Sequence, residues 1–404
     1  MKKVLMTASV PSMIGQFNMD NIRILKELGY QVHVACCFRD TSVWTEERTA
    51  AFLRELYENG VACLPVDFSR HPLDISRHIR AFRQLCAYMK QETYAFVHCH
   101  TPLAGAVTRL AAWRGKIRVM YTAHGFHFYR GASLAGWLLY YPAEKLLSHL
   151  TEVLITVNRE DYRRAREKLH AKKTAYIPGV GIDVESLEKR DERSGQNLGW
   201  EKRRREKRRE LGLSHEDFVL LSVGELSKRK NHSAVIRALA RVGHCRWKYV
   251  ICGIGDQESR LRQMARRLHV EKQVMFAGYR TDVEDFYGMA DLFVFPSLQE
   301  GMPVALMEAM ASGLACLASD IRGNRDLLGR EEEACLYTLG DQDMLERKLQ
   351  IFFRNSGLRG RIALENQKRI WEFDKSRVDE RMRKLYETMG REGIHGRKTE
   401  YEAV

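Results

Sequence analysis

Short apolar segments alternate with longer amphipathic ones along the chain. Apolar runs rich in β-branched and aromatic residues predict parallel strands in the first half, at Val4–Thr7, Val32–Cys36, Val61–Val66, Phe96–His100, Val119–Ala123 and Val153–Thr156. Apolar positions at helical spacing predict the helices between them, at Asn18–Leu28, Trp44–Glu58, Ile75–Lys90, Leu103–Trp113, Leu134–His149 and Arg159–Leu169. The segment 9–18 after the first strand is expected to be a loop. This alternation predicts an α/β protein with parallel sheets.

The alternation repeats in the second half, where strands are predicted at Phe218–Val223, Trp247–Ile251, Val274–Ala277, Leu292–Phe295 and Ala315–Ser319. A polar stretch from Glu188 to Leu211 separates the halves, and 404 residues exceed what one core usually holds. Apolar positions from Val378 to Met389 have the spacing of one helix face. We therefore predict two domains, 1–188 and 213–370, with a charged linker at 189–212, a final helix at 371–390 and a polar tail at 391–404.

The segment from Asp291 to Gly313 predicts a strand, a loop and a helix. Pro303 suits the first position of that helix, because the missing N–H of proline costs nothing there. The backbone N–H groups of Gly301, Met302 and Val304 are expected near the helix start, where free donors and the helix dipole favour an anion. The sequence thus predicts a phosphate-like ligand at this point.

Two glutamates accompany this segment. Glu308 stands among apolar residues of the predicted helix, and burying its carboxylate without a partner would be costly. A vicinal diol of a ligand would satisfy it, and Glu300 provides a second acceptor at the same strand end, where ligands of open α/β sheets bind. The alternative is that Glu308 pairs with an Arg or lies on a solvated edge.

The composition of the chain is basic. Sixty-six Lys and Arg against 52 Asp and Glu give a net charge of +14, which favours an anionic partner: nucleic acid, a sugar nucleotide or an anionic membrane face. The densest run, Glu201 to Glu210, is interpreted as a solvated linker helix. It has no interleaved aromatic residue, so nucleic acid is not expected as a partner.

The compartment is predicted from the cysteines and from the apolar runs. No CxxC pair is present, and most cysteines fall in apolar runs, so they are interpreted as buried thiols in a reducing compartment; they are Cys36, Cys37, Cys63, Cys86, Cys99, Cys245, Cys252, Cys316 and Cys335. The N-terminus is interpreted as a first strand rather than a signal peptide. No apolar run is long enough to span a membrane. We expect a cytoplasmic protein.

The order and spacing of several motifs resemble the retaining glycosyltransferases of family 4, which have the GT-B fold. The residues that match the Glu-x7-Glu signature of that family are Pro296, Ser297, Glu300, Gly301, Pro303, Glu308, Ala309 and Gly313. Further matches are VGELSKRKNH from Val223, CGIGD from Cys252, FAGYRTDV from Phe276, ADLFVFPS from Ala290 and ASDIRGNRD from Ala318. The resemblance covers essentially the whole chain and is strongest from about Phe218 to Leu328.

This resemblance implies two Rossmann-like domains facing each other across a cleft, with a C-terminal helix that crosses back to the first domain. It implies a retaining hexosyltransferase that moves a sugar from a nucleotide diphosphate donor, a UDP-sugar, to a lipid-linked saccharide in the synthesis of cell-surface polysaccharide. The first domain is then the acceptor side and the second the donor side. Neither a cofactor nor a metal is expected. Asp282 and Asp285 form no Asp-x-Asp motif and look like a helix start.

The resemblance also implies roles for individual residues. The catalytic residues are His124, Lys230 and Glu300. The donor-binding residues are Gly224, Arg229, Lys230, Gly253, Gly278, Arg280, Gly301, Met302, Pro303, Val304 and Glu308. Glu225 stands where the family usually has Arg, so Arg229 or Lys228 is expected to replace that cation.

Gly15 and His127 are assigned to the acceptor side of the first domain. The segment 9–18 holds only Gly15, where the family commonly has a richer glycine loop, so a phosphate-binding loop is the equal alternative for Gly15. His127 is expected to shape the acceptor pocket together with Phe126, Phe128 and Tyr129. We expect His98 and His100 to point to opposite sides of their strand, each with a core or supporting role.

The segment from Ala132 to Leu150 is unusually aromatic and apolar, with Trp137, Tyr140 and Tyr141 close together. Such residues favour a membrane interface, and the resemblance to enzymes acting on polyprenyl carriers predicts peripheral binding to an anionic membrane surface at its cytoplasmic face. The alternative is a core helix under the sheet.

Two other functions stay open from the sequence. A glycoside hydrolase would use Glu300 and Glu308 as its pair of carboxylates. A non-catalytic module would bind the nucleotide sugar without turnover, as the unusual Glu225 suggests.

Overall fold

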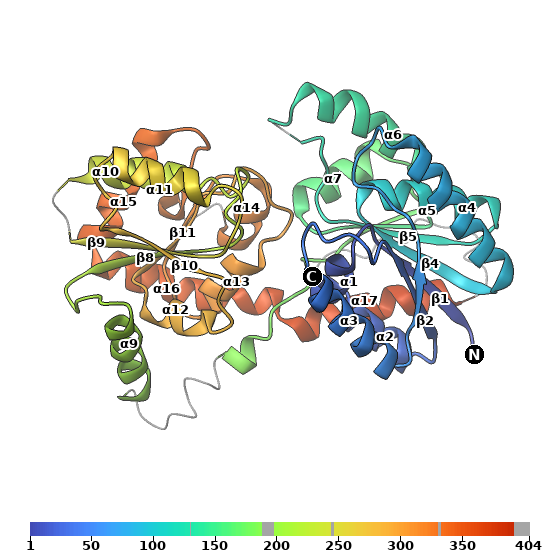
Figure 1. Ribbon diagram of the computed structural model, residues 1–404, viewed down its shortest axis with the longest axis horizontal. Helices are drawn as coiled ribbons and strands as arrows, with labels where there is room; N and C mark the ends of the chain where they lie inside the picture. Colours follow the sequence, from blue (N-terminus) through green and yellow to red (C-terminus); the bar gives the residue numbers. More distant parts are fainter. Residues whose placement is uncertain (130, 188–197, 244–245, 330–332, 392–404) are drawn as a thin grey trace. The chain divides into compact units, whose positions relative to one another are not determined.

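The computed structural model describes residues 1–129, 131–187, 198–243, 246–329 and 333–391. The chain divides into two compact units (Figure 1). Unit 1 comprises Met1–Val180 together with the C-terminal segment from Ser376, and unit 2 comprises Gly181–Lys375. Residues 188–197 of the predicted polar stretch and linker, residues 392–404 of the predicted tail, and Cys245 lie outside the described residues.

Unit 1 contains a seven-stranded parallel sheet with the order β3-β2-β1-β4-β5-β6-β7. Its strands are β1 (Lys3–Thr7), β2 (Gln31–Cys36), β3 (Ala62–Pro65), β4 (Tyr94–His100), β5 (Val119–Ala123), β6 (Val153–Thr156) and β7 (Lys173–Tyr176). Its helices before the C-terminal segment are α1 (Pro11–Phe17), α2 (Met19–Glu27), α3 (Glu46–Glu58), α4 (Ile75–Gln91), α5 (Pro102–Arg114), the π-helix η1 (Gly136–Tyr140), α6 (Tyr141–Ser148) and α7 (Arg159–Lys168). Val4 and Met6 enter one apolar core and Leu5 the other, because successive side chains of a strand alternate between faces. Helices cover both faces of the sheet (Figure 1).

Two segments of unit 1 differ from the prediction. The expected loop 9–18 contains the helix α1, which begins at Pro11, where the fixed φ of proline suits a first turn. The expected helix Leu134–His149 is divided into η1 and α6. Pro142 is the second residue of α6 and lacks the N–H that a continuous α-helix would bond to the carbonyl of Leu138, so the wider π register precedes it.

Unit 2 contains a six-stranded parallel sheet with the order β10-β9-β8-β11-β12-β13. Its strands are β8 (Phe218–Val223), β9 (Trp247–Cys252), β10 (Val274–Gly278), β11 (Leu292–Phe295), β12 (Cys316–Ser319) and β13 (Leu336–Tyr337). Its helices are α9 (Leu198–Glu210), α10 (His232–Val242), α11 (Glu258–Arg267), α12 (Val283–Met289), α13 (Val304–Ala311), α14 (Arg322–Leu328), η2 (Glu333–Cys335), α15 (Gln342–Arg354), α16 (Ser356–Ile370) and η3 (Trp371–Phe373).

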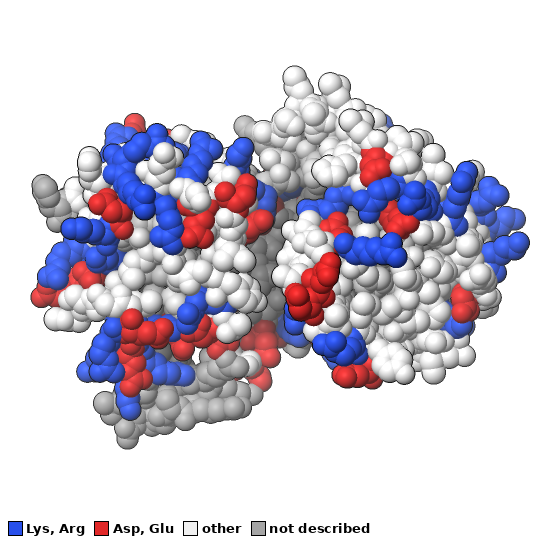
Figure 2. Space-filling view, viewed as in Figure 1, with Lys and Arg blue, Asp and Glu red and all other residues white. Residues whose placement is uncertain are grey.

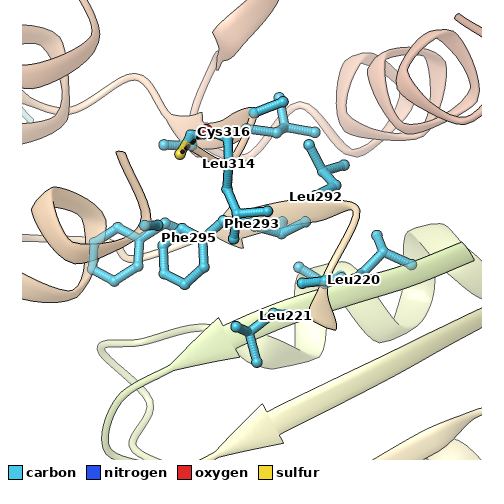
Figure 3. Close-up of a cluster of buried hydrophobic side chains, with 14 of the residues drawn as sticks. Leu220, Leu221, Leu292, Phe293, Phe295, Leu314 and Cys316 are labelled. Carbon is cyan, nitrogen blue, oxygen red and sulfur yellow. Dashed lines mark hydrogen bonds between the residues drawn. The ribbon is translucent and has the colours of Figure 1, made fainter. Parts of the chain in front are cut away.

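The middle of the second sheet is apolar on both faces. β11 pairs with β8 on one side and with β12 on the other. Figure 3 shows Leu221 of β8, Phe293 of β11 and Cys316 of β12 within one buried cluster. A parallel strand covered by helices on both faces has no solvent side, which explains the continuous apolar run at β11.

The last helix, α17 (Lys375–Gly390), begins in unit 2 and packs in unit 1. Val378, Met382, Tyr386 and Met389 are buried in the same core as Val4. This confirms the prediction that the C-terminal helix returns to the first domain.

The helix α9 contradicts the prediction of a solvated linker helix. Arg208 is 5% exposed, and its guanidinium donates to the carbonyl of Met289 (3.0 Å) and to the carboxylate of Asp291 (2.8 Å). Arg204 donates to the other oxygen of Asp291, and Lys207 donates to Asp282. Positions three and four apart lie on one helix face, so this charged face of α9 packs against the rest of unit 2 instead of facing water.

Most described cysteines are buried, as predicted, and all of them are free thiols. Cys63 and Cys86 are the half-buried exceptions within the described residues.

Candidate functional site

The strand order of unit 2 reverses between β8 and β11. In open α/β sheets, ligands bind outside the carboxyl ends of the strands at such a switch point. The loop after β8 (224–231) and the loop after β11 (296–303) meet there, and the N–H of Leu298 donates to the carbonyl of Arg229 (2.8 Å). The fold therefore brings together candidate residues that lie far apart in the sequence.

Lys230 and Arg229 both form ion pairs with one oxygen of Glu300, and Arg229 also donates a hydrogen bond to it. The distances to Oε1 are 2.9 Å from Nζ of Lys230 and 2.6 Å from Nη1 of Arg229. Nζ of Lys230 also lies 4.7 Å from the ring centroid of Phe295. Lys230 is only 12% exposed, so its charge lies in a partly shielded place, where an ionic hydrogen bond is stronger than in water.

Glu225 points into solvent, with Nη2 of Arg229 4.0 Å from its carboxylate. Of the two expected substitutes for the family arginine, Arg229 contacts Glu300. Lys228 is exposed and lines a different pocket, with Asn231 and His232. The structure thus favours Arg229.

Three glycines end the neighbouring strands β8, β9 and β10. The N–H of Gly224 donates to the carbonyl of Cys252, and the N–H of Gly253 donates to the carbonyl of Gly278 (2.7 Å). A Cβ on Gly253 would lie 1.9 Å from the carbonyl oxygen of Gly224. Close packing of the strand ends is enough to require glycine at Gly253, and donor binding by these glycines stays a prediction.

The helix α13 begins at Val304, one residue later than predicted. Pro303 is its N-cap with extended backbone angles (φ −82°, ψ 116°). α14 packs closely on the loop that precedes α13, because a Cβ on Gly323 would lie 2.4 Å from the carbonyl oxygen of Gly301. Gly301 and Met302 are half-buried beside this helix start.

Glu308 has a partner, but it is not an arginine. The hydroxyl of Tyr287 donates to Oε2 of Glu308 (2.8 Å). Burial raises the pKa of the Glu308 carboxyl, which the Tyr287 hydrogen bond opposes. Oε1 accepts no hydrogen bond from the described residues, so one oxygen remains for a ligand.

Arg280, which is predicted to bind the donor, forms hydrogen bonds with a carboxylate of unit 2. Its guanidinium donates twice to Asp282, at 2.7 and 2.6 Å. Hydrogen bonds from Arg280 and from Lys207 hold the pKa of Asp282 well below its usual range. Asp282 is the N-cap residue of α12, which confirms its interpretation as a helix start.

His98 and His100 lie on the same side of β4, and the opposite prediction is wrong. Side chains alternate along a strand, so residues two positions apart share a face. Their ring centroids are 4.2 Å apart. Both are buried, as the predicted core role requires.

His124 lies directly after β5 and is the third histidine of this cluster. Its Nε2 lies 3.1 Å from Nδ1 of His100. Burial lowers the pKa of His124 to about 4. His124 lines a pocket of unit 1 together with Phe17, Asp20 and Asp379.

Two of the residues expected to shape an acceptor pocket with His127 lie in the core, and the acceptor-side role of His127 stays a prediction. Phe126 and Phe128 are buried and stacked on each other, with centroids 4.6 Å apart, so they belong to the core. His127 is exposed and stacks on Tyr140 (4.5 Å). Gly15 lies in α1, where a Cβ would come within 2.4 Å of the Trp44 ring.

Comparison with known proteins identifies the family. A family model described as "Glycosyl transferase 4-like domain" matches residues 14–179, and one described as "Glycosyl transferases group 1" matches residues 203–369. The Bacillus subtilis (strain 168) protein named "Putative glycosyltransferase EpsD" is 31% identical over 391 residues, which cover 95% of this chain and 96% of EpsD. The chain belongs to this glycosyltransferase family. A second relative of the transferase is the UDP-Gal:alpha-D-GlcNAc-diphosphoundecaprenol alpha-1,3-galactosyltransferase of Escherichia coli, 29% identical over 279 residues, 67% of this chain and 69% of the relative.

Solved structures share the fold of the transferase. Anabaena HepE in complex with UDP and glucose has a TM-score of 0.74 at 18% identity, covering 96% of this chain and all of HepE (100%). WaaG, a glycosyltransferase involved in lipopolysaccharide biosynthesis, has a TM-score of 0.67 at 18% identity, covering 95% of this chain and 99% of WaaG. The expected GT-B fold, built from two Rossmann-like domains, is confirmed.

Sequence reasoning missed several residues that hold the site of the transferase in place. Tyr287 binds Glu308, and Tyr386 donates to or accepts from His98 across 288 positions of sequence. Asp161, fully buried, accepts from the N–H of Phe126 and so fixes the loop after His124. For Asp161 the sequence did offer a signal, because Asn158 and Asp161 follow closely after a continuous apolar run that forms a buried strand.

Proposed function

We propose that the transferase moves a sugar from a UDP-sugar to a lipid-linked saccharide, with retention of the anomeric configuration, during synthesis of a cell-surface polysaccharide. The observation that carries this proposal is the cluster of Lys230, Arg229 and Glu300 at the switch point of unit 2. Names of similar proteins support the substrate classes: the E. coli relative is named for UDP-Gal and a diphosphoundecaprenol acceptor, and Erwinia amylovora AmsK for amylovoran biosynthesis.

In this proposal unit 2 binds the donor. Lys230 and Arg229 exchange part of their contact with Glu300 for the donor diphosphate, whose negative charge grows as the bond to the sugar breaks. The start of α13 adds backbone donors, and the free oxygen of Glu308 accepts from the ribose hydroxyls. His124 and the acceptor side belong to unit 1.

The proposed reaction uses no enzymatic nucleophile. The bond between the anomeric carbon and the diphosphate oxygen breaks, and the acceptor hydroxyl oxygen bonds to that carbon from the same side. The hydroxyl proton passes to the leaving diphosphate oxygen. Because Lys230 and Arg229 supply the positive charge, we propose that the reaction needs no metal ion.

A panel of UDP-sugars, incubated with a polyprenyl-diphosphate saccharide, tests the function. We expect one donor to give a lipid-linked product with the anomeric configuration of the donor, unchanged by a chelator. Inversion, or a loss of turnover that a metal ion restores, would contradict the mechanism. Donor binding without turnover would indicate the non-catalytic module. Cleavage of a glycoside without any sugar nucleotide would indicate a hydrolase, which the family assignment disfavours.

Glu308→Gln is expected to weaken donor binding by about tenfold or more, because hydrogen bonds to a charged acceptor contribute roughly 1.5 to 3 kcal/mol. The amide keeps the shape of the side chain and can still accept from Tyr287. Titration calorimetry with UDP-sugar measures the change. Asp285→Asn, an exposed substitution on α12, is the control. Unchanged donor affinity in a folded Glu308→Gln protein would remove Glu308 from the site.

The surface of η1 and α6 supports the proposed membrane contact. Leu134, Leu138, Leu139 and Leu146 are 79%, 77%, 54% and 71% exposed, whereas Trp137 packs on the buried Phe128. The alternative of a core helix under the sheet therefore does not hold for the leucines. Figure 2 shows this end of unit 1 as mostly uncharged, above a band in which Lys and Arg outnumber the Asp and Glu between them. Within the described residues no helix is long and apolar enough to cross a membrane.

We propose that these leucines enter the outer part of an anionic bilayer at its cytoplasmic face. Burying one leucine contributes roughly 1.5 to 3 kcal/mol, so the double variant Leu134→Glu with Leu138→Glu is expected to abolish sedimentation with anionic vesicles at low salt. Leu364→Glu, at a leucine of α16 that is 60% exposed, is the control. A wild-type protein that stays in the supernatant at low salt, or equal loss in both variants, would refute the membrane contact and leave the transferase reaction standing.

A further inference from the structure

The rings of His98, His100 and His124 lie next to one another at the pocket of unit 1. Their hydrogen bonds differ. Both ring nitrogens of His98 are bonded, Nδ1 to the hydroxyl of Tyr386 (2.9 Å) and Nε2 to that of Thr122 (2.8 Å). His100 uses only Nδ1, which lies 3.1 Å from Nε2 of His124. Among the described residues, the buried Nε2 of His100 has no hydrogen-bond partner.

All three rings are neutral near pH 7. Burial lowers the pKa of His98 to about 3 and that of His124 to about 4, and it lowers the pKa of His100 well below its usual value. A neutral imidazole carries one N–H and one lone pair, so only one of the two rings can donate in the bond between His100 and His124.

The unpartnered Nε2 of His100 decides which ring donates. If Nε2 of His124 donated, His100 would have to carry its own proton on Nε2, which would leave a buried N–H without an acceptor. Orphaned buried N–H groups are rarer in proteins than under-used acceptors, because the donor loses its only possible bond. The arrangement that avoids this has the proton of His100 on Nδ1, donating to Nε2 of His124.

We propose that His100 is a positioning residue that holds His124 in the tautomer with its proton on Nδ1. Nδ1 of His124 has no partner among the described residues and is not a buried atom. His124 therefore offers a neutral hydrogen-bond donor to an oxygen of a ligand, such as a sugar hydroxyl or a phosphate oxygen, and does not act as a base through this nitrogen. The ligand-binding part of this inference rests on the proposed function, but the tautomer does not.

Nitrogen-15 NMR of the full chain with labelled histidine tests the tautomer directly, without donor or acceptor. Each ring nitrogen is observed as protonated or unprotonated, and the spectra of His124→Gln and His100→Asn identify the two rings. We expect Nδ1 to be protonated and Nε2 unprotonated in both His100 and His124. A protonated Nε2 in His124 would overturn the proposal, whatever the enzyme does.

Substitutions of His100 separate positioning from packing. His100→Leu removes the donor, so the preference of His124 for Nδ1–H should be lost and kcat/KM should fall by roughly three- to tenfold, as for one neutral hydrogen bond. His100→Asn places an amide N–H near the position of Nδ1 and should restore both. His98→Leu is the matched control, because His98 is equally buried on the same face of β4 but does not bond to His124.

Thermal unfolding of each variant shows whether it is folded. If His100→Leu folds and His124 keeps its proton on Nδ1, the positioning role is refuted. If the tautomer shifts as expected but kcat/KM does not change, the positioning role stands and the proposed part of His124 in the reaction fails.

Discussion

Lys230→Met is expected to reduce kcat with the preferred UDP-sugar by about 100- to 1,000-fold, the loss typical when one preorganised donor to a developing anion is removed. The ammonium of Lys230 lies at the switch point of unit 2, 12% exposed, with Glu300 as its present counter-ion. A cation in a partly shielded place needs no reorganisation when the diphosphate leaves. Methionine keeps about the length of the side chain but has no charge, so it also loses the contact of the ammonium with the Phe295 ring.

The fold is expected to survive this change, because Glu300 keeps the guanidinium of Arg229 as a partner. Lys228→Met is the matched control, since Lys228 is exposed on the same loop and lines another pocket. Steady-state kinetics and thermal unfolding of both variants check the prediction. A folded Lys230→Met protein with kcat within threefold of wild type would remove Lys230 from the reaction.

The sequence predicts the strands of this fold best where burial is complete. β8 and β11 read as continuous apolar runs because helices cover both faces of their sheet. β7 was missed because its four residues, Lys173–Tyr176, include a lysine and a threonine and form no apolar run, and β13 because it has only two residues. A strand prediction needs an apolar run of about four residues or more.

Charge runs were harder to interpret than apolar runs. The basic segment of α9 looks solvated in the sequence, since nothing near Arg208 in the chain offers a carboxylate on the right face. Its partner Asp291 is 83 positions away. Only the folded chain shows that an arginine here is buried and bonded to carbonyls as well.

The sequence indicates where the candidate site lies, but not which side chains contact one another in it. Residues directly after parallel strands predict the edge where ligands bind, and the structure brings Lys230 and Glu300 together at that edge. The bonds between Glu308 and Tyr287 and between His98 and Tyr386 join side chains far apart in the chain. No local pattern reports such pairs, because they depend on which helix packs on which strand.

The largest effect on stability is expected from a buried ion pair that no motif indicated. Arg109 of α5 is fully buried, and it donates to Glu144 of α6 through both Nη1 (2.6 Å) and Nη2 (3.0 Å). Its Nε donates to the carbonyl of Gly105, and its guanidinium lies 4.2 Å from the ring centroid of Tyr121. Each of the three nitrogens of this guanidinium thus donates at least one hydrogen bond inside unit 1.

Glu144→Gln is expected to destabilise unit 1 by roughly 3 to 5 kcal/mol, because it leaves a buried guanidinium without its counter-charge. For a unit of this size, that corresponds to a fall in Tm of about 6 to 20 °C. Glu380→Gln is the control: Glu380 pairs with Lys384 on α17, both side chains are 64% exposed, and the loss of an exposed ion pair is expected to change Tm very little.

Replacing both partners distinguishes the cost of an unpaired charge from the value of the pair. The double variant Arg109→Met with Glu144→Met puts apolar side chains of similar length in the same space, and well-packed replacements of buried ion pairs are often neutral. We expect it to recover most of the stability that Glu144→Gln loses, as measured by thermal unfolding of the isolated full chain. A double variant that is less stable than Glu144→Gln would show instead that the ion pair itself is needed to hold α6 on α5. The position of the leucines of α6 would then depend on that pair.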